Sequence, residues 1–166
     1  MKSFLAIFFL LAATNAIGQT NKKDTVTFCY IKYAIPAGCK ADSASTVKCG
    51  DWQMTWVYLN AEMLQSFTDQ LVSQMAGRFK KFKEEPISCY LLDHPAKGYR
   101  LSFQKGEETI HQLIAYGFAN EQPVFVQISL HKDPHSNEDI PAFARQMITL
   151  SHESLKEVAS VGSTLE

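Results

Sequence analysis

The chain has 166 residues, of which 46% are hydrophobic and 20% are charged, and its formal net charge is −1. This length fits one domain, and this composition is that of a globular protein, so disorder is not expected. The near-zero net charge and the lack of any run dominated by Lys and Arg argue against nucleic acid as a partner.

The N-terminus has the pattern of a secretory signal peptide. Lys2 precedes an apolar run over residues 4–13, and Ala16 and Gly18 match the small residues before a cleavage site. The apolar run, at about ten residues, is too short to cross the roughly 30 Å core of a bilayer.

We therefore expect residues 1–18 to be a signal peptide, cleaved near Gly18 and Gln19. Residues 19–166 are expected to form a single α+β domain with an ordered core over about residues 25–158. No membrane span is expected after cleavage, and the location is expected to be periplasmic or secreted.

Two strands are predicted next. Residues 25–35 are rich in β-branched and aromatic side chains, and Pro36 ends them. Over residues 47–59 an aromatic stripe shares one face, formed by Trp52, Met54, Trp56 and Tyr58. The stripe is a candidate binding surface because interfaces are enriched in such side chains, but a stripe at strand spacing is more often core.

The four cysteines are an even set in a small exported chain, which favours disulfides over zinc because no C-x-x-C pair is present. If the first two strands pair about the loop between them, Cys29 and Cys49 lie about 13 Å out of register. We therefore expect Cys39 to pair with Cys49 and Cys29 to pair with Cys89.

A long amphipathic helix is predicted over about residues 61–81, with Asn60 as its cap. Its apolar residues recur at three- and four-residue steps, at Met63, Leu64, Phe67, Leu71, Met75, Phe79 and Phe82. This helix is expected to rest on the aromatic stripe. A short strand over residues 86–92 follows, and Asp93, His94 and Pro95 are expected to break it.

Residues 99–131 predict an antiparallel meander of three strands. Apolar and polar residues alternate over residues 99–104, 110–118 and 123–131, and short polar links join the three runs. A second long helix is predicted from Ile140 and Pro141 through Leu150, and an extension over residues 154–158 is left open.

The order β-β-α-β-β-β-β-α predicts an α+β fold, in which an antiparallel sheet of about six strands is covered by two long helices. The sequence Tyr-Ala-Ile-Pro-Ala-Gly at residues 33–38 and the meander followed by a helix resemble the Mog1/PsbP-like family of α-β-α sandwich domains. The resemblance implies a binding or assembly-assisting module without catalytic residues, so no site residue carries over.

Three sets of residues are candidates for function. The aromatic stripe offers Trp52, Trp56 and Tyr58, and a more polar row on the third meander strand offers Phe125, Gln127, Ser129 and His131. The third set, His131, Asp133 and His135, could offer two imidazoles and a carboxylate to a metal ion. Pro134 interrupts that spacing and no fourth ligand is indicated, so histidines beside a surface turn are the simpler interpretation.

The sequence predicts an exported, non-catalytic binding protein of the bacterial periplasm or exterior. Its partner would be an unknown protein or small ligand, and no cofactor is expected. No G-x-S-x-G, S-x-x-K or glycine-rich phosphate loop is present. Two alternatives stay open: a periplasmic immunity protein that blocks a delivered toxin, and a metal-assisted hydrolase that uses His131, Asp133 and His135.

Overall fold

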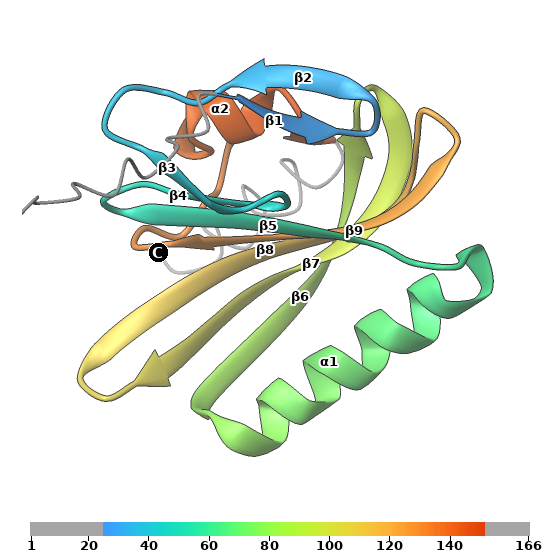
Figure 1. The fold of residues 1–166 in the computed structure, drawn as a ribbon. Coiled ribbons are helices and arrows are strands. Elements are labelled where there is room, and N and C mark those ends of the chain that lie inside the picture. The colour runs from blue at the N-terminus through green and yellow to red at the C-terminus, as the bar shows by residue number, and fades with distance from the viewer. Residues whose placement is uncertain (1–24, 152–166) are drawn as a thin grey trace, which may run out of the picture.

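The computed structural model describes residues 25–151. A small hairpin of β1 (Thr25–Phe28) and β2 (Ile31–Ala34) lies beside an eight-stranded antiparallel sheet in the order β10-β6-β7-β8-β9-β5-β4-β3 (Figure 1). The strands of the large sheet are β3 (Lys40–Ser43), β4 (Thr46–Lys48), β5 (Trp52–Tyr58), β6 (Lys80–Leu91), β7 (His94–Lys105), β8 (Glu108–Ala119), β9 (Gln122–Leu130) and β10 (Ile148–Leu150). The helices are η1 (Ala61–Met63), α1 (Leu64–Arg78), η2 (Asn137–Asp139) and α2 (Ala142–Arg145).

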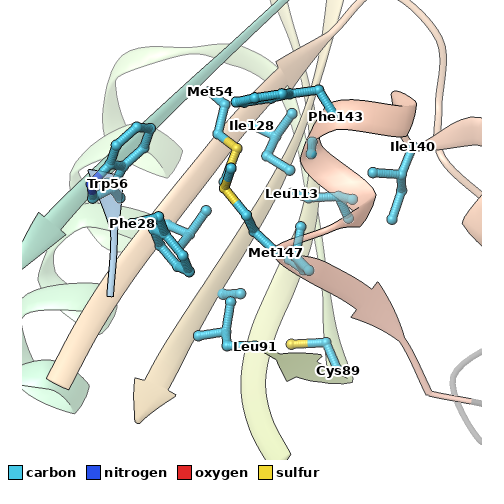
Figure 2. Close-up of a cluster of buried hydrophobic side chains, with 14 of the residues drawn as sticks. Phe28, Met54, Trp56, Cys89, Leu91, Leu113, Ile128, Ile140, Phe143 and Met147 are labelled. Carbon is cyan, nitrogen blue, oxygen red and sulfur yellow. The ribbon is translucent and has the colours of Figure 1, made fainter. Parts of the chain in front are cut away.

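Both faces of the large sheet are apolar and covered. The β1–β2 hairpin and α2 lie on one face, which we call the hairpin face, and α1 lies on the other, the helix face (Figure 1). The core of the hairpin face includes Phe28, Met54, Trp56, Leu113 and Met147 (Figure 2). The core of the helix face includes Leu64, Val72, Leu101, Ile114 and Phe125. Alternate side chains of one strand thus enter different cores.

The predicted meander is confirmed as β7, β8 and β9, which pair in sequence. Gly106 adopts a positive φ of 66° in the turn between β7 and β8, a conformation that costs glycine little. The helix predicted over residues 61–81 is also found, as η1 and α1, although it ends at Arg78. Asn60 stands at the cap position of η1, but its side chain makes no capping hydrogen bond.

Two predicted single strands are each divided in the structure. Residues 25–35 form the β1–β2 hairpin, in which Cys29 and Tyr30 make the turn with φ values of 46° and 69°. Residues 47–59 contain β5 and most of β4, which pair with each other. Alternation reports which face a side chain occupies and not where the chain reverses, so the Cys29–Tyr30 turn, which has neither glycine nor proline, gives no signal. The link between β4 and β5 contains Gly50, a turn signal that the prediction missed.

The prediction of a sheet of about six strands under two long helices is wrong. The second helix has only the four residues of α2, and Ile148–Leu150 form β10, which pairs with the edge of β6. Ile148 and Leu150 are both buried on the hairpin face, which is the alternation of a strand. The helical spacing of the apolar residues before them does not continue through this segment. The suggested extension over residues 154–158 lies outside the described residues.

The short strand predicted over residues 86–92 is part of the much longer β6. Asp93 and His94 do not break the sheet, because Leu92 and Asp93 make a two-residue turn and β7 starts directly at His94. Among residues 25–151, no helix has the length and apolar character that crossing a membrane requires.

Candidate functional site

The predicted disulfide between Cys39 and Cys49 is confirmed, with the two Cα atoms 4.3 Å apart. It lies one residue beyond the Lys40–Lys48 pair, where β3 and β4 are already in antiparallel register. The bond therefore closes the open end of the β3–β4 hairpin at the edge of the sheet.

The second predicted disulfide is not formed, because Cys29 and Cys89 are both free and buried. Cys29 lies in the β1–β2 turn, where its backbone N–H donates to the Tyr58 hydroxyl at 2.8 Å. Cys89 lies in β6 opposite Leu150 of β10. Removal from water raises the pKa of both thiols, to about 11 for Cys29 and about 12 for Cys89. Raised pKa values mean that both stay protonated and unreactive near neutral pH.

The aromatic stripe on β5 is largely core. Trp56 is 1% exposed and its ring meets Phe28 edge to face at 5.7 Å, while Trp52 stacks on Phe143 at 5.9 Å. The stripe rests under the β1–β2 hairpin and α2, so the expectation that it supports the long helix is wrong. Tyr58, at the end of the stripe, is partly exposed.

The polar row on β9 lies on the helix face. Phe125 is buried under α1, where its ring meets Phe67 at 5.2 Å. Gln127 donates to the Gln112 side-chain oxygen at 2.8 Å, and Gln112 in turn donates to Ser129 at 3.1 Å. Packing and internal hydrogen bonds thus account for the inner part of this row.

A cluster of polar side chains centres on Arg100 of β7. Its guanidinium donates to Glu85, the residue directly opposite on β6, and to His135 Nδ1 at 2.6 Å. Asp133 Oδ1 lies 3.8 Å from both Arg100 Nε and His111 Nδ1. We call these five residues, Glu85, Arg100, His111, Asp133 and His135, the Arg100 cluster. Its first three residues lie on the neighbouring strands β6, β7 and β8, and the other two lie in the loop after β9.

The loop that carries Asp133 and His135 is fixed by Asp139. This carboxylate accepts from Lys132 Nζ at 2.5 Å, from the Ser136 hydroxyl at 3.0 Å and from the backbone N–H of His135 at 3.1 Å. These hydrogen bonds, that of Lys132 foremost, lower the pKa of Asp139 to about 2. Asp139 therefore stays ionised and holds the loop across the usual pH range.

The structure does not assemble the suggested metal ligands. Asp133 Oδ2 lies 3.5 Å from His135 Nε2, but His131 is exposed and lines a different hollow, beside Lys48 and Trp52. Within residues 25–151 no three His, Cys, Asp or Glu side chains are placed to hold a metal ion. Instead Arg100 borders a polar hollow of about 360 Å³, which is also lined by Glu85 and Asp133.

Three two-residue turns meet at one end of the molecule, at the upper right of Figure 1. They are Cys29 with Tyr30, Leu92 with Asp93, and Asn120 with Glu121, and all six residues have positive φ. Asn120 donates to the Cys29 carbonyl at 3.1 Å, and Gln122 donates to the Tyr30 hydroxyl at 2.6 Å. Such backbone strain in non-glycine residues is costly and is often found at functional sites.

Large apolar side chains are exposed around these turns. Tyr30 is 74% exposed and Phe118 is 49% exposed, and Ile31 and Tyr90 are also open to solvent. Ile31 and Tyr90 further line a hollow of about 200 Å³, together with Leu92. We call this region, with its three turns and four exposed side chains, the hairpin end.

The sequence analysis did not identify the hairpin end. Of the residues proposed for binding, Tyr58 is hydrogen-bonded to it, through its hydroxyl, which accepts from the Cys29 backbone N–H. Tyr30 and Tyr90 lie in strand-like segments whose alternation does not separate a buried ring from an exposed one. These residues are neighbours only because three separate turns of the chain lie side by side in the fold.

Comparison of the chain with protein-family models and with curated proteins finds no match.

Proposed function

We propose that this chain is an exported, non-catalytic binding protein that contacts a partner protein through the hairpin end. The observation that carries the proposal is the exposure of Tyr30, Ile31, Tyr90 and Phe118 around three neighbouring turns. Soluble proteins seldom gather large apolar side chains on their surface without a use for them, and aromatic anchors dominate protein interfaces.

The hairpin end is also preorganised for binding. A tyrosine presents a large ring with few rotatable bonds, so it loses little conformational entropy when a partner covers it. The hydrogen bonds from Asn120 to Cys29 and from Gln122 to Tyr30 tie the β8–β9 turn to the β1–β2 turn. A surface that is held in one conformation before binding gives higher affinity, because less conformational entropy is lost when the partner binds.

Export is supported by the chemistry of the cysteines. The Cys39–Cys49 disulfide is typical of proteins that work in the periplasm or outside the cell, where thiols are oxidised. The pattern of Lys2 and the apolar run after it points to the same compartment.

The proposal is tested with affinity capture from the native cell envelope, using the full chain as bait. The double variant Tyr30→Ser, Phe118→Ser is expected to recover at least about tenfold less of the partner, since losing central aromatic anchors costs 2 kcal/mol or more, roughly. Lys105→Ser, at the end of β7 that lies away from the hairpin end, is the control and should recover the partner as the native chain does.

Equal recovery by the double variant and the native chain would show that the partner binds elsewhere. Circular dichroism and thermal unfolding establish that the variants are folded. Because both substituted side chains are exposed, little effect on stability is expected.

A further inference from the structure

We propose that the Cys39–Cys49 disulfide is a redox-controlled latch, which holds the edge strand β3 on the sheet while it is oxidised and lets β3 separate when a dithiol reduces it. The rest of the fold stays in place in both states. This inference concerns the edge of the sheet formed by β3 and does not depend on the hairpin end.

β3 has few other contacts that hold it to the fold. It is the last strand in the sheet order and pairs with β4 alone, with an irregularity in register between Ala41 and Ser43. Ala41 packs partly against the hairpin-face core, and the other three residues of β3 are exposed. Among residues 25–151, its one salt bridge joins Lys40 to Asp42 within the strand itself, at 3.0 Å. The disulfide, directly before β3 and directly after β4, is therefore the main constraint on this pairing.

The pair of residues beside the disulfide is electrostatically unfavourable. Lys40 and Lys48 lie directly opposite each other, and both are exposed. Like charges that face each other on antiparallel strands destabilise the pairing. Asp42 offsets part of this repulsion through its salt bridge to Lys40. Once the covalent bond is broken, the open end of the β3–β4 hairpin thus begins with a repulsive pair.

β4 is held independently of β3, because β5 pairs with its other side. Backbone hydrogen bonds extend this pairing beyond both ends of β4. The Cys49 N–H donates to the Trp52 carbonyl at 2.9 Å, and the Trp56 N–H donates to the Ser45 carbonyl at 3.0 Å. Reduction is therefore expected to release residues 39–44 and to leave β4 in the sheet as the new edge.

The replacement of one edge strand by another changes what the sheet presents to its surroundings. β3 is short and irregular and exposes the charged residues Lys40 and Asp42, which are features that keep an edge from pairing with a strand of another chain. Its separation would leave backbone N–H and C=O groups of β4 without their partners. The latch thus controls whether the sheet ends in a protected edge.

One of the two bonded cysteines is open to a reductant. Cys49 is partly exposed, whereas the free thiols of Cys29 and Cys89 belong to residues that are 1% and 2% exposed. Cys49 also lines a hollow of about 140 Å³ beside Gly50. A Cβ atom added at Gly50 would meet no atom within 4 Å, so the approach over this residue is unobstructed.

The reaction is a thiol–disulfide exchange with a dithiol as the reductant. One thiolate of the dithiol attacks Cys49 Sγ, which forms a mixed disulfide and breaks the bond to Cys39. Cys39 leaves as a thiolate and takes up a proton. The second thiol of the dithiol then attacks the mixed disulfide and releases Cys49, which is also protonated. The dithiol has given up two electrons and leaves as a disulfide.

The test uses the full native chain with and without dithiothreitol, a small dithiol, at about pH 8. Alkylation with iodoacetamide and peptide mass spectrometry identify the cysteines that have become reactive. Cys39 and Cys49 are expected to be alkylated after reduction, and Cys29 and Cys89 are expected to stay unmodified. Amide hydrogen exchange then measures protection in the reduced, folded chain.

Protection over residues 40–48 is expected to fall at least about tenfold on reduction, since a disulfide that closes a short loop contributes that much or more. Protection over residues 95–118 of β7 and β8 should change by less than about twofold. The double variant Cys39→Ser, Cys49→Ser is the matched control. It should show the lower protection over residues 40–48 without the dithiol and no further change with it.

Three results would each overturn the proposal. One is full protection over residues 40–48 after reduction, which would mean that other contacts hold β3. Another is a loss of protection over residues 95–118 with alkylation of Cys29 and Cys89, which would mean that the bond stabilises the whole fold. The third is the absence of alkylation at Cys39 and Cys49, which would mean that no dithiol reaches the bond in the folded chain. The native chain decides among these results by itself if the double variant does not fold.

Discussion

Two buried thiols illustrate how the surroundings of a residue change its chemistry. Cys29 and Cys89 belong to the same buried cluster, yet one lies in the β1–β2 turn and the other faces β10. Spacing along the chain suggested that they were partners, because two pairs had to be made from four cysteines. The fold instead leaves both as protonated thiols within an apolar core.

We expect thiol titration of the unfolded, unreduced protein to find two thiols per chain. In the folded protein at about pH 8 both should react far more slowly, since burial excludes the reagent and the raised pKa values leave little thiolate. Absorbance after addition of a disulfide reagent measures both quantities. Finding no thiol would mean that Cys29 and Cys89 are bonded, and finding four would mean that Cys39 and Cys49 are not.

At the scale of elements, β7 and β8 approach each other unusually closely at Gly98. A Cβ atom at this position would lie 1.9 Å from the backbone oxygen of Ile114. Neither strand can shift cheaply, because each pairs along ten residues of the other. Gly98 is therefore required by the central strand pair, which also carries Arg100 two residues later.

Two alanine substitutions separate this effect from the general cost of glycine. Gly98→Ala is expected to lower the free energy of unfolding by about 3 kcal/mol or more, through the clash with Ile114. Gly77→Ala in α1 meets no atom within 4 Å and should raise stability by about 0.5 to 1 kcal/mol, because alanine favours the helix. Urea denaturation measures both. Equal effects of the two substitutions would contradict the close approach.

At the scale of the whole molecule, one sheet connects two cores. Leu113 and Ile114 are adjacent in β8 and fully buried, but Leu113 enters the core of the hairpin face and Ile114 that of the helix face. Neither α1 nor the β1–β2 hairpin with α2 can separate from the sheet without exposing one apolar face of the same strands. We infer that residues 25–151 unfold as one cooperative unit.

Leu113→Ala and Ile114→Ala are each expected to destabilise the protein by about 2 to 5 kcal/mol, since each leaves a cavity in a closed core. For both variants, tryptophan fluorescence, which reports on Trp52 and Trp56 at the hairpin face, and far-ultraviolet circular dichroism, which reports on the secondary structure of the whole molecule including α1, should give the same unfolding midpoint. Two separated transitions in either variant would show that the covers unfold independently.

Local patterns predicted the elements that satisfy their hydrogen bonds and bury their side chains with near neighbours. The meander, the long helix and the Cys39–Cys49 bond are of this kind, because alternation, helical spacing and a short loop each act within a few residues. The burial of Met54 and Trp56 also agrees with the interpretation of the stripe as core.

Only the tertiary structure decided the rest. The apolar residues at 148–150 fit a helix or a strand, and the unpaired edge of β6 made them a strand. Arg100, His111 and His135 are far apart in the chain and meet because β7, β8 and the loop after β9 pack together. A sequence pattern indicates on which face of a strand or helix a side chain lies, whereas its contacts depend on distant segments, and the candidate sites of this protein are made of such contacts.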